Sequence, residues 1–197
     1  MEKDMIILYI IAAFVLGSIP FGVIIAKTKG VDLRKTGSGN IGATNVLRSV
    51  GKWAAVFTLA GDMLKGALPV IIARQLSLTE SAVGLIGISA ILGHDFSIFS
   101  RFKGGKGVAT SLGVLLVYSP VVGVLSVAIW LVALAVWRYS SLSAIIAFFF
   151  VPVNIYIFDY STSKLMFGVT MLLLIVYKHK DNIERLLKGT ESSVRKK

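Results

Sequence analysis

The 197-residue sequence contains no cysteine, only 2 histidines and only 10 acidic residues. Without cysteine the chain can form no disulfide, no thiolate metal site and no cysteine nucleophile. His94 and His179 are far apart in the sequence and lack the short spacing that is typical of metal ligands. The scarcity of these residues therefore argues against a metal site and excludes a disulfide framework.

Charge is also scarce, and most of it carries one sign. Charged residues make up 16% of the chain, against roughly 25% in an average globular protein. Hydrophobic residues make up 55%, and the mean hydropathy is +0.81. The net charge of +11 is concentrated in short segments between apolar runs, which is typical of the cytoplasmic loops of membrane proteins. Nucleic-acid binders carry basic patches on soluble folds instead, so a membrane protein without a nucleic-acid partner is predicted.

The apolar runs predict membrane-spanning helices, because a spanning helix needs about 20 mostly apolar residues. Backbone groups in lipid must satisfy one another, which favours helices over other structures. The first run is longer than the core of a signal peptide and has no clear basic segment before it, so it predicts a retained helix. The runs cover residues 5–26, 53–74, 81–99, 107–137, 139–158 and 161–177.

The run 107–137 is too long for one crossing. As a single helix it would extend over about 46 Å, whereas the hydrocarbon core is about 30 Å thick. Pro120 lies inside the run, and proline breaks or kinks a helix. A turn there also places the basic loop 27–52, Arg138 and the basic C-terminal segment on the same side, as the positive-inside rule requires.

The sequence therefore predicts an all-α, polytopic membrane protein with seven transmembrane helices, one of them short at about 107–118. The N-terminus is expected outside and the C-terminus in the cytoplasm. The whole chain, 1–197, is interpreted as a single integral membrane domain with cytoplasmic motif loops at 27–52, 94–110 and 177–191. The last seven residues are predicted to form a disordered basic tail.

The first motif loop is rich in glycine and contains the pattern G-x-G-x-x-G at 37–42. A dinucleotide-binding fingerprint needs a preceding strand in a βαβ unit, whereas a membrane helix is predicted here. Glycines nevertheless let backbone amides approach an anion, and the N-terminus of a helix favours negative charge. The loop is interpreted as a phosphate-binding segment, with a capped glycine turn as the alternative. Its candidate ligands are Ser38, Gly39, Asn40, Asn45 and Arg48.

The second motif loop contains Gly104-Gly105-Lys106-Gly107 at the start of the short helix. It is not a P-loop, because Gly107 occupies the position that requires serine or threonine, so ATP is not predicted. Glycine amides and the dipole of the following helix still favour a phosphate there. Lys103 and Lys106 add positive charge. The alternative is a positive-inside loop whose lysines meet lipid headgroups.

The third motif loop places His179 and Asn182 three residues apart, so that on a helix they share one face. The histidine could act as a base or donate to phosphate, and the asparagine could orient it. The alternative is an amphipathic helix that lies on the membrane surface and binds lipid phosphates.

Two further features stay open at this stage. Asp62 and Lys65 lie inside the second apolar run with the spacing of an ion pair, which indicates either a functional site or a structural pair. Ser141 lies where a helix begins after Arg138, so it either caps that helix or contacts substrate.

The segments 38–48, 93–110 and 177–191 resemble the three motifs of the bacterial acyl-phosphate-dependent glycerol-3-phosphate acyltransferases. The resemblance runs from about Gly17 to Glu191, in order and with similar spacing. It implies transfer of a fatty acyl group from acyl phosphate to the sn-1 hydroxyl of glycerol 3-phosphate. The products would be lysophosphatidic acid and phosphate, for phospholipid synthesis. It further implies a multi-pass protein of the bacterial inner membrane, acting without a cofactor, with its active site facing the cytoplasm. A monomer in contact with membrane lipid is expected.

The resemblance also implies roles for particular residues. Both substrates are anions and acyl phosphate is already activated, so positioning and charge stabilisation are the main requirements. Lys106, Arg48 and the glycine amides are expected to bind phosphate. The proton of the attacking hydroxyl passes either to His179 or to the leaving phosphate, and the sequence leaves this open. The residues implied as needed are Ser38, Arg48, His179 and Asn182, with Gly104–Gly107 forming the glycerol-phosphate site, Ser141 near the substrate and Glu191 in a more structural role.

A rival interpretation is a membrane transporter of phosphate esters or other small anions. Such transporters bind their substrates near the midplane of the bilayer, on broken helices. In this sequence the glycines and basic residues occur in loops on one predicted side. Acyl transfer is therefore the preferred interpretation.

Overall fold

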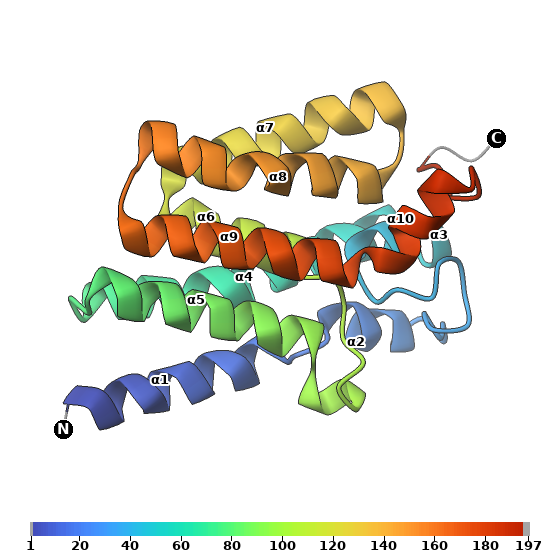
Figure 1. Cartoon of the computed structure of the whole chain (residues 1–197). Coiled ribbons are helices and arrows are strands. Elements are labelled where there is room, and N and C mark those ends of the chain that lie inside the picture. Colours follow the sequence, from blue (N-terminus) through green and yellow to red (C-terminus); the bar gives the residue numbers. More distant parts are fainter. Residues whose placement is uncertain (1, 195–197) are drawn as a thin grey trace.

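The computed structural model describes residues 2–194, and within this range the chain is helical with no strand. The all-α prediction is confirmed. In Figure 1 the long helices run roughly along one axis, and α3, α10 and the loops that adjoin them gather at one end, here called the motif end. The elements are α1 (Glu2–Gly17), α2 (Phe21–Lys27), α3 (Ala43–Ser49), α4 (Lys52–Gln75), α5 (Glu80–Asp95), the short 3-10 helix η1 (Ile98–Ser100), α6 (Val108–Tyr118), α7 (Pro120–Trp137), α8 (Ser140–Phe158), α9 (Thr162–Lys178) and α10 (Lys180–Leu187).

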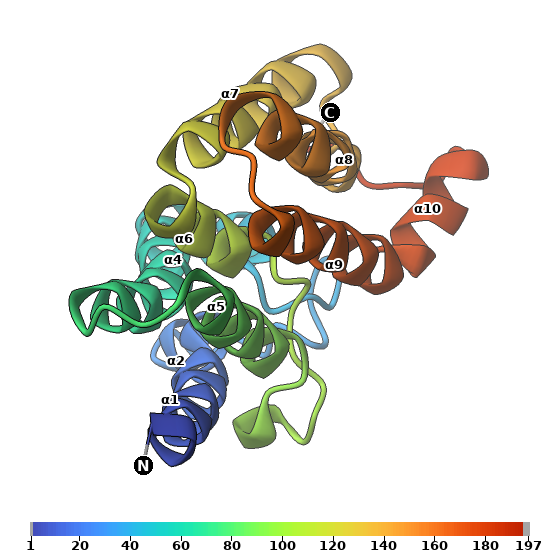
Figure 2. The ribbon, with the colours of Figure 1, turned by 60° about the vertical axis from the view of Figure 1, so that its left-hand side comes forward.

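Five segments of the described chain are long and apolar enough to cross a membrane. They are residues 4–27, 52–75, 80–100, 120–137 and 140–158, and each corresponds to a run found in the sequence. The remaining run, 161–177, forms the shorter helix α9, with 17 residues, and the first part of run 107–137 forms α6, with 11 residues. Figure 2 shows α4, α5, α6 and α9 lying between α1 on one side and the pair α7 and α8 on the other.

The first apolar run is not one continuous helix. It breaks between α1 and α2 at residues 18–20, where Pro20 has no amide hydrogen to continue the ladder. The carbonyl groups freed by the break find donors elsewhere: Ser97 Oγ donates to Ser18 O, and Lys65 Nζ donates to Ile19 O at 2.7 Å. The break was not predicted, because the apolar pattern continues through it.

The run 107–137 divides where the sequence predicts. α6 ends at Tyr118, Ser119 is the N-cap of α7, and Pro120 occupies the first helical position, where its missing amide hydrogen has no cost. A Cβ on Gly123 would lie 2.7 Å from the backbone nitrogen of Leu116, so glycine is what lets α7 fold back closely on α6.

Small residues bring the helix backbones together inside the bundle. A Cβ on Gly113 would overlap Met63 O of α4, and one on Gly93 would overlap Phe14 O of α1. Helices in lipid gain little from the hydrophobic effect between them, so close backbone packing at small residues is a main source of their association. Larger side chains fill the centre, with Phe148, Leu115 and Met171 fully buried.

The C-terminal segment differs from the prediction. Residues 191–194 do not form a free tail: Val194 N donates to Arg138 O at 2.8 Å, and Glu191 accepts three side-chain hydrogen bonds. The sequence shows only a charged, poorly apolar end and cannot show these partners. Residues 195–197 of the predicted tail lie outside the described residues.

Candidate functional site

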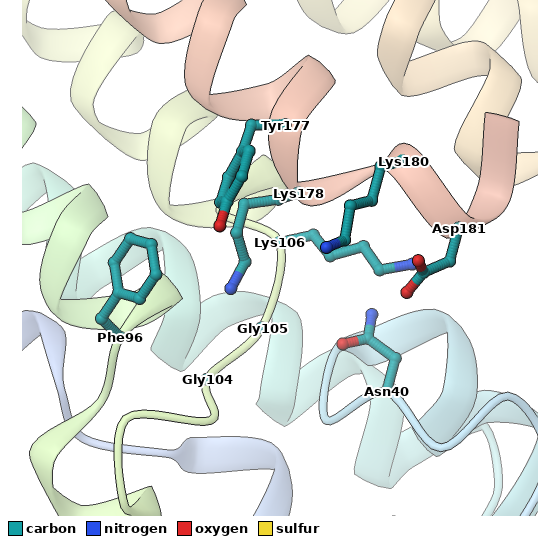
Figure 3. A pocket seen from close by; sticks show the side chains of 9 residues that line it. All are labelled: Asn40, Phe96, Gly104, Gly105, Lys106, Tyr177, Lys178, Lys180 and Asp181. Carbon is teal, nitrogen blue, oxygen red and sulfur yellow. The ribbon is translucent and has the colours of Figure 1, made fainter.

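The three motif loops meet at the motif end and enclose a cavity of about 270 Å³. Asn40 comes from the first loop, Gly104, Gly105 and Lys106 come from the second, and the third supplies most of the remainder. Figure 3 shows Lys178 pointing from the end of α9 toward Gly104 and Gly105, with Asn40 on the facing side. The complete lining is Asn40, Phe96, Gly104, Gly105, Lys106, Tyr177, Lys178, Lys180 and Asp181.

The glycine segment lies folded back over the end of α5. Gly104 N donates to Asp95 O at 3.3 Å, and Gly105 N donates to His94 O at 3.0 Å. Gly107 then takes a left-handed conformation, with φ of +73°, and begins α6 without a side-chain cap. The amides of Gly104 and Gly105 are therefore already paired with carbonyl oxygens of α5. The first-turn amides of the uncapped helix α6 are suited to an anion, so the predicted phosphate cradle is reduced to the start of α6.

Lys106 begins a chain of hydrogen bonds that reaches α10 and α8. Its ammonium donates to Asn182 Oδ1, and Asn182 Nδ2 donates to Glu191 Oε1 at 2.6 Å. Ser141 Oγ donates to the same carboxylate oxygen at 2.7 Å. Burial and, to a smaller extent, the positive charge of Arg185 lower the pKa of Lys106 to about 8 against the opposing effect of Glu191.

Glu191 is the acceptor that joins this network. Arg185 Nε donates to its second oxygen, Oε2, at 2.7 Å. Burial raises the pKa of Glu191, but the hydrogen bonds from Ser141, Asn182 and Arg185 outweigh burial, so its pKa lies below the ordinary value. One carboxylate therefore ties the start of α8 to α10.

His179 lies at the junction of α9 and α10, and only 3% of its surface is exposed. Its Nδ1 lies 2.8 Å from Ile175 O, and because a carbonyl only accepts, Nδ1 must carry the hydrogen. In the neutral ring Nε2 is then a bare acceptor. Burial and, to a smaller extent, the nearby positive charge of Lys106 lower the pKa of His179 to about 4. His179 is therefore neutral at pH 7 and a weak base.

The first loop is organised by Asn45, which is 1% exposed. Asn45 Oδ1 accepts from Ser38 N at 2.9 Å, and its Nδ2 donates to the carbonyl oxygens of Leu33, Thr36 and Asn40 at 2.8 to 3.2 Å. All hydrogen-bonding groups of this side chain are used inside the loop. Ser38 and Gly39 form the outer turn, and the Ser38 side chain is exposed.

Arg48 lines a second cavity, of about 510 Å³, between the first loop and the C-terminal segment. One of its guanidinium nitrogens donates to Ser192 O and to Ser193 O, both at 3.0 Å. Lys103 is exposed and lines neither cavity, and its carbonyl accepts from Arg34. Of the predicted residues, the structure brings Asn40, Gly104, Gly105 and Lys106 together at the first cavity, and Arg48 lines the second. Asn182 is hydrogen-bonded to Lys106, and Ser141 joins it through Glu191. Gly107 and His179 are chain neighbours of residues that line the first cavity.

Several residues that line the first cavity were not predicted from the sequence: Phe96, Tyr177, Lys178, Lys180 and Asp181. Lys178 Nζ donates to Asp95 O at 2.7 Å and lies 4.6 Å from the centre of the Phe96 ring. The available signal was the pair of lysines on either side of His179. Because basic residues near helix ends also obey the positive-inside rule, that signal alone does not predict a site.

A buried charged cluster lies directly behind the glycine segment. Lys65 Nζ is 2.8 Å from Asp62 Oδ1, and His94 Nδ1 is 3.6 Å from the same oxygen. The ion pair expected from the spacing of Asp62 and Lys65 is therefore present. Within residues 2–194 no group of three or more histidine, cysteine or acidic side chains is arranged to hold a metal.

Comparison with known proteins identifies the chain. A family model described as glycerol-3-phosphate acyltransferase matches residues 7–189. The glycerol-3-phosphate acyltransferase of Geotalea daltonii is 48% identical over 94% of this chain and 96% of its own length. That of Geobacter sulfurreducens is 44% identical over 91% of this chain and 93% of its own.

Two solved structures share the fold. A crystal structure of PlsY, an integral membrane glycerol 3-phosphate acyltransferase, in its glycerol 3-phosphate form superposes with a TM-score of 0.92 at 42% identity, covering 96% of this chain and 95% of that one. The lysophosphatidic acid form gives 0.90 at 41% identity with the same coverage. The resemblance seen in the three motifs is confirmed, and the chain belongs to the glycerol-3-phosphate acyltransferase family.

Proposed function

We propose that this enzyme transfers a fatty acyl group from acyl phosphate to the sn-1 hydroxyl of glycerol 3-phosphate, giving lysophosphatidic acid and phosphate. The main support is the cavity at the motif end, which Lys106, Lys178 and Lys180 line together with the Gly104-Gly105 segment that leads into α6. Three ammonium groups and a helix N-terminus favour a phosphate dianion strongly. Glycerol 3-phosphate carries such a group, and a related structure is described as its bound form.

The second anion would bind beside Arg48. Its guanidinium now donates to two neutral carbonyls, Ser192 O and Ser193 O, and a phosphate would be a stronger acceptor. We assign the phosphate of acyl phosphate to this side, where Gly37 of the same loop also lines the cavity and is followed in the turn by Ser38 and Gly39. Asn45 supports this arrangement by holding the loop and does not itself contact substrate. Lys103, which is exposed, contributes positive charge at the rim.

The reaction needs one bond formed and one broken. The glycerol oxygen attacks the acyl carbonyl carbon, and the bond from that carbon to the phosphate oxygen breaks. Preorganised donors lower the barrier by stabilising the oxyanion. We assign this to Ser38 and Asn182, while Ser141 holds Asn182 in place through Glu191.

The proton of the hydroxyl has two possible acceptors. The His179 pKa of about 4 makes the ring a weak base, which favours the leaving phosphate as the final acceptor. The bare Nε2 of His179 would accept a hydrogen bond from the hydroxyl and orient it. His179→Gln removes this ring acceptor, so a large loss of kcat is expected even if phosphate takes the proton.

We further propose that the chain crosses a bacterial inner membrane seven times as a monomeric, single-domain protein. The crossings are α1 with α2, then α4, α5, α6, α7, α8 and α9. An odd number of crossings places α10 on the opposite side from the start of α1, in agreement with Figure 1. The basic loops at the motif end favour the cytoplasm for that end, and hence the N-terminus outside.

The test is phosphate release by the purified protein in detergent, given palmitoyl phosphate and glycerol 3-phosphate, with lysophosphatidic acid measured in parallel. Release that requires both substrates is expected. Folded protein that forms no lysophosphatidic acid from either acyl phosphate or acyl-CoA would contradict the proposal. Uptake of labelled glycerol 3-phosphate into sealed liposomes would then test transport, although both cavities lie at one end and not at the midplane where transporters bind.

A further inference from the structure

The side chain of His94 forms the floor beneath Gly105. Gly105 N donates to the backbone oxygen of His94 at 3.0 Å. A Cβ built on Gly105 would overlap Nε2 of the His94 ring and would lie 2.9 Å from Cε1 and 3.0 Å from Cδ2. The three atoms that such a Cβ would meet first all belong to this one ring. Gly105 therefore rests directly on an imidazole.

The ring is held from its other side by charges within the bundle. Asp62 Oδ1 lies 3.6 Å from His94 Nδ1 and 2.8 Å from Lys65 Nζ. Lys65 Nζ in turn donates to Ile19 O, in the break between α1 and α2. His94, Asp62 and Lys65 are each exposed by 4% or less.

Such a cluster is a poor source of stability. Removing charges from water costs several kcal/mol per ion, which their attraction offsets only when the geometry is very good. Asp62 Oδ1 and His94 Nδ1 lie near each other without an aligned hydrogen bond. A group of charges kept inside a membrane protein at such a cost points to function.

Gly105 is followed directly by Lys106, whose ammonium reaches Asn182 from the same backbone segment. A shift of Gly105 would move both the amides of the cradle and this ammonium. Because Gly105 packs against the His94 ring, the position of this ring affects where the groups proposed to bind phosphate lie.

We propose that His94 is a positioning residue for the acceptor substrate: its ring sets the height of Gly105, and so places Lys106 and the loop amides for a phosphate monoester dianion. Asp62 and Lys65 hold the ring in that position. This inference rests on the proposed function and adds to it a role for the buried cluster.

The neighbouring glycine provides a matched control. A Cβ on Gly104 would overlap the backbone oxygen of His94 and would lie 2.7 Å from the backbone carbon of Asp95. Its obstacle is backbone, which no side-chain substitution removes. Neither glycine has a positive φ, so an alanine at either position meets its neighbours without left-handed strain.

The experiment is a double-mutant cycle on the full-length protein in detergent, with KM for glycerol 3-phosphate, KM for acyl phosphate and kcat measured separately. Gly105→Ala is expected to raise KM for glycerol 3-phosphate about tenfold or more, since small misplacements of binding groups are costly. In His94→Ala/Gly105→Ala the obstacle is gone, and this KM should return to within about threefold of that of His94→Ala alone. Gly104→Ala should not be improved by the same His94→Ala change.

The outcomes separate the inference from the proposed function. A double variant that is as impaired as Gly105→Ala would overturn the role of His94, and so would equal rescue of Gly104→Ala. An inactive wild-type protein would contradict the proposed function instead. Size-exclusion profiles and thermal unfolding identify the folded variants. If His94→Ala/Gly105→Ala yields too little protein, His94→Ser/Gly105→Ala replaces it and is judged by the same KM comparison.

Discussion

The two ends of the bundle both concentrate charge, but they balance it differently. At the end opposite the motif loops, Lys164 Nζ lies 2.6 Å from Asp159 Oδ1 and 3.4 Å from Glu80 Oε1. Ser119 Oγ donates to Asp159 Oδ2 at 2.5 Å, and Tyr118 OH donates to Glu80 O at 3.1 Å. Each carboxylate there has a donor from another turn, so these side chains form a cluster of ion pairs and hydrogen bonds between helices. This cluster of Glu80, Tyr118, Ser119, Asp159 and Lys164 is here called the clamp.

The motif end carries an excess of positive charge instead. Lys106, Lys178 and Lys180 line one cavity with a single acid, Asp181, and Arg48 faces a second cavity. Glu191 also lies at this end, but its hydrogen bonds go to Ser141, Asn182 and Arg185 and not to the lysines of the cavity. A balanced cluster ties helices together, whereas an unbalanced one favours an anion. Substitutions at the two ends should therefore have different consequences.

The largest effect is expected from Lys106→Ala, which removes the cation at the centre of the motif end. Under the proposed function this charge contacts substrate, and its loss should reduce kcat/KM by about 10² to 10³-fold. Steady-state kinetics with both substrates measures this. Lys188→Ala is the control, because Lys188 is exposed, lines neither cavity and pairs with Glu184 on α10. Equal activity of Lys106→Ala and wild type would show that the cavity is not the phosphate site.

A smaller effect is expected from Glu191→Ala, which removes the shared acceptor of the network. Three donors would lose their partner, at a cost of about 1–3 kcal/mol in unfolding free energy, and Asn182 would lose its orientation, reducing kcat about 10 to 100-fold. Denaturation in detergent and kinetics measure the two consequences separately. Glu191→Gln keeps one acceptor oxygen and should lie between Ala and wild type. Normal kcat in Glu191→Ala would contradict the positioning role.

The pH dependence of kcat/KM should follow the titration of the Lys106 ammonium. Its pKa in the free enzyme is lowered to about 8, so the ammonium is charged below that value and loses its proton as the pH rises through it. We expect kcat/KM for glycerol 3-phosphate to fall on the alkaline side of pH 8, by about tenfold per pH unit at most. Lys106→Arg stays charged, so its alkaline limb should move to higher pH. An unshifted limb in Lys106→Arg would assign the titration to another group.

The smallest effect on catalysis is expected at the opposite end. Lys164→Ala breaks the clamp, and because the side chain of Lys164 is 16% exposed, we expect a loss of about 1–2 kcal/mol in unfolding free energy. Activity at low temperature should stay within about twofold of wild type, since no residue of the clamp lines either cavity. Thermal unfolding and KM are the measurements. A raised KM for glycerol 3-phosphate would show that the two ends are coupled.

Several features of this protein follow from local sequence. Pro120 ends one helix and begins the next because of its own covalent structure, and the apolar runs are helical because backbone in lipid has no other partner. The three motif loops could be placed on one side from their charge, and the glycines at 104–107 predicted a phosphate-binding segment there. These arguments need only the residue and its immediate neighbours.

Other features depend on residues that are distant in the sequence. The break at 18–20 is satisfied by Lys65 and Ser97, and Glu191 is ordered because Ser141 and Asn182 reach it from two other segments. Asn45, predicted as a ligand, proves to hold its own loop, because an amide side chain can serve either purpose and only packing selects one.

Sequence alone thus determined the helical class, the division of the fourth apolar run and the placement of the three motif loops on one side, because hydropathy, proline and charge act locally. Only the tertiary structure decided that Lys106 and Arg48 face different cavities and that an imidazole lies beneath Gly105. The physical reason is that hydrogen bonds and steric contacts act over a few ångströms, and only folding brings residues from separate helices within that range.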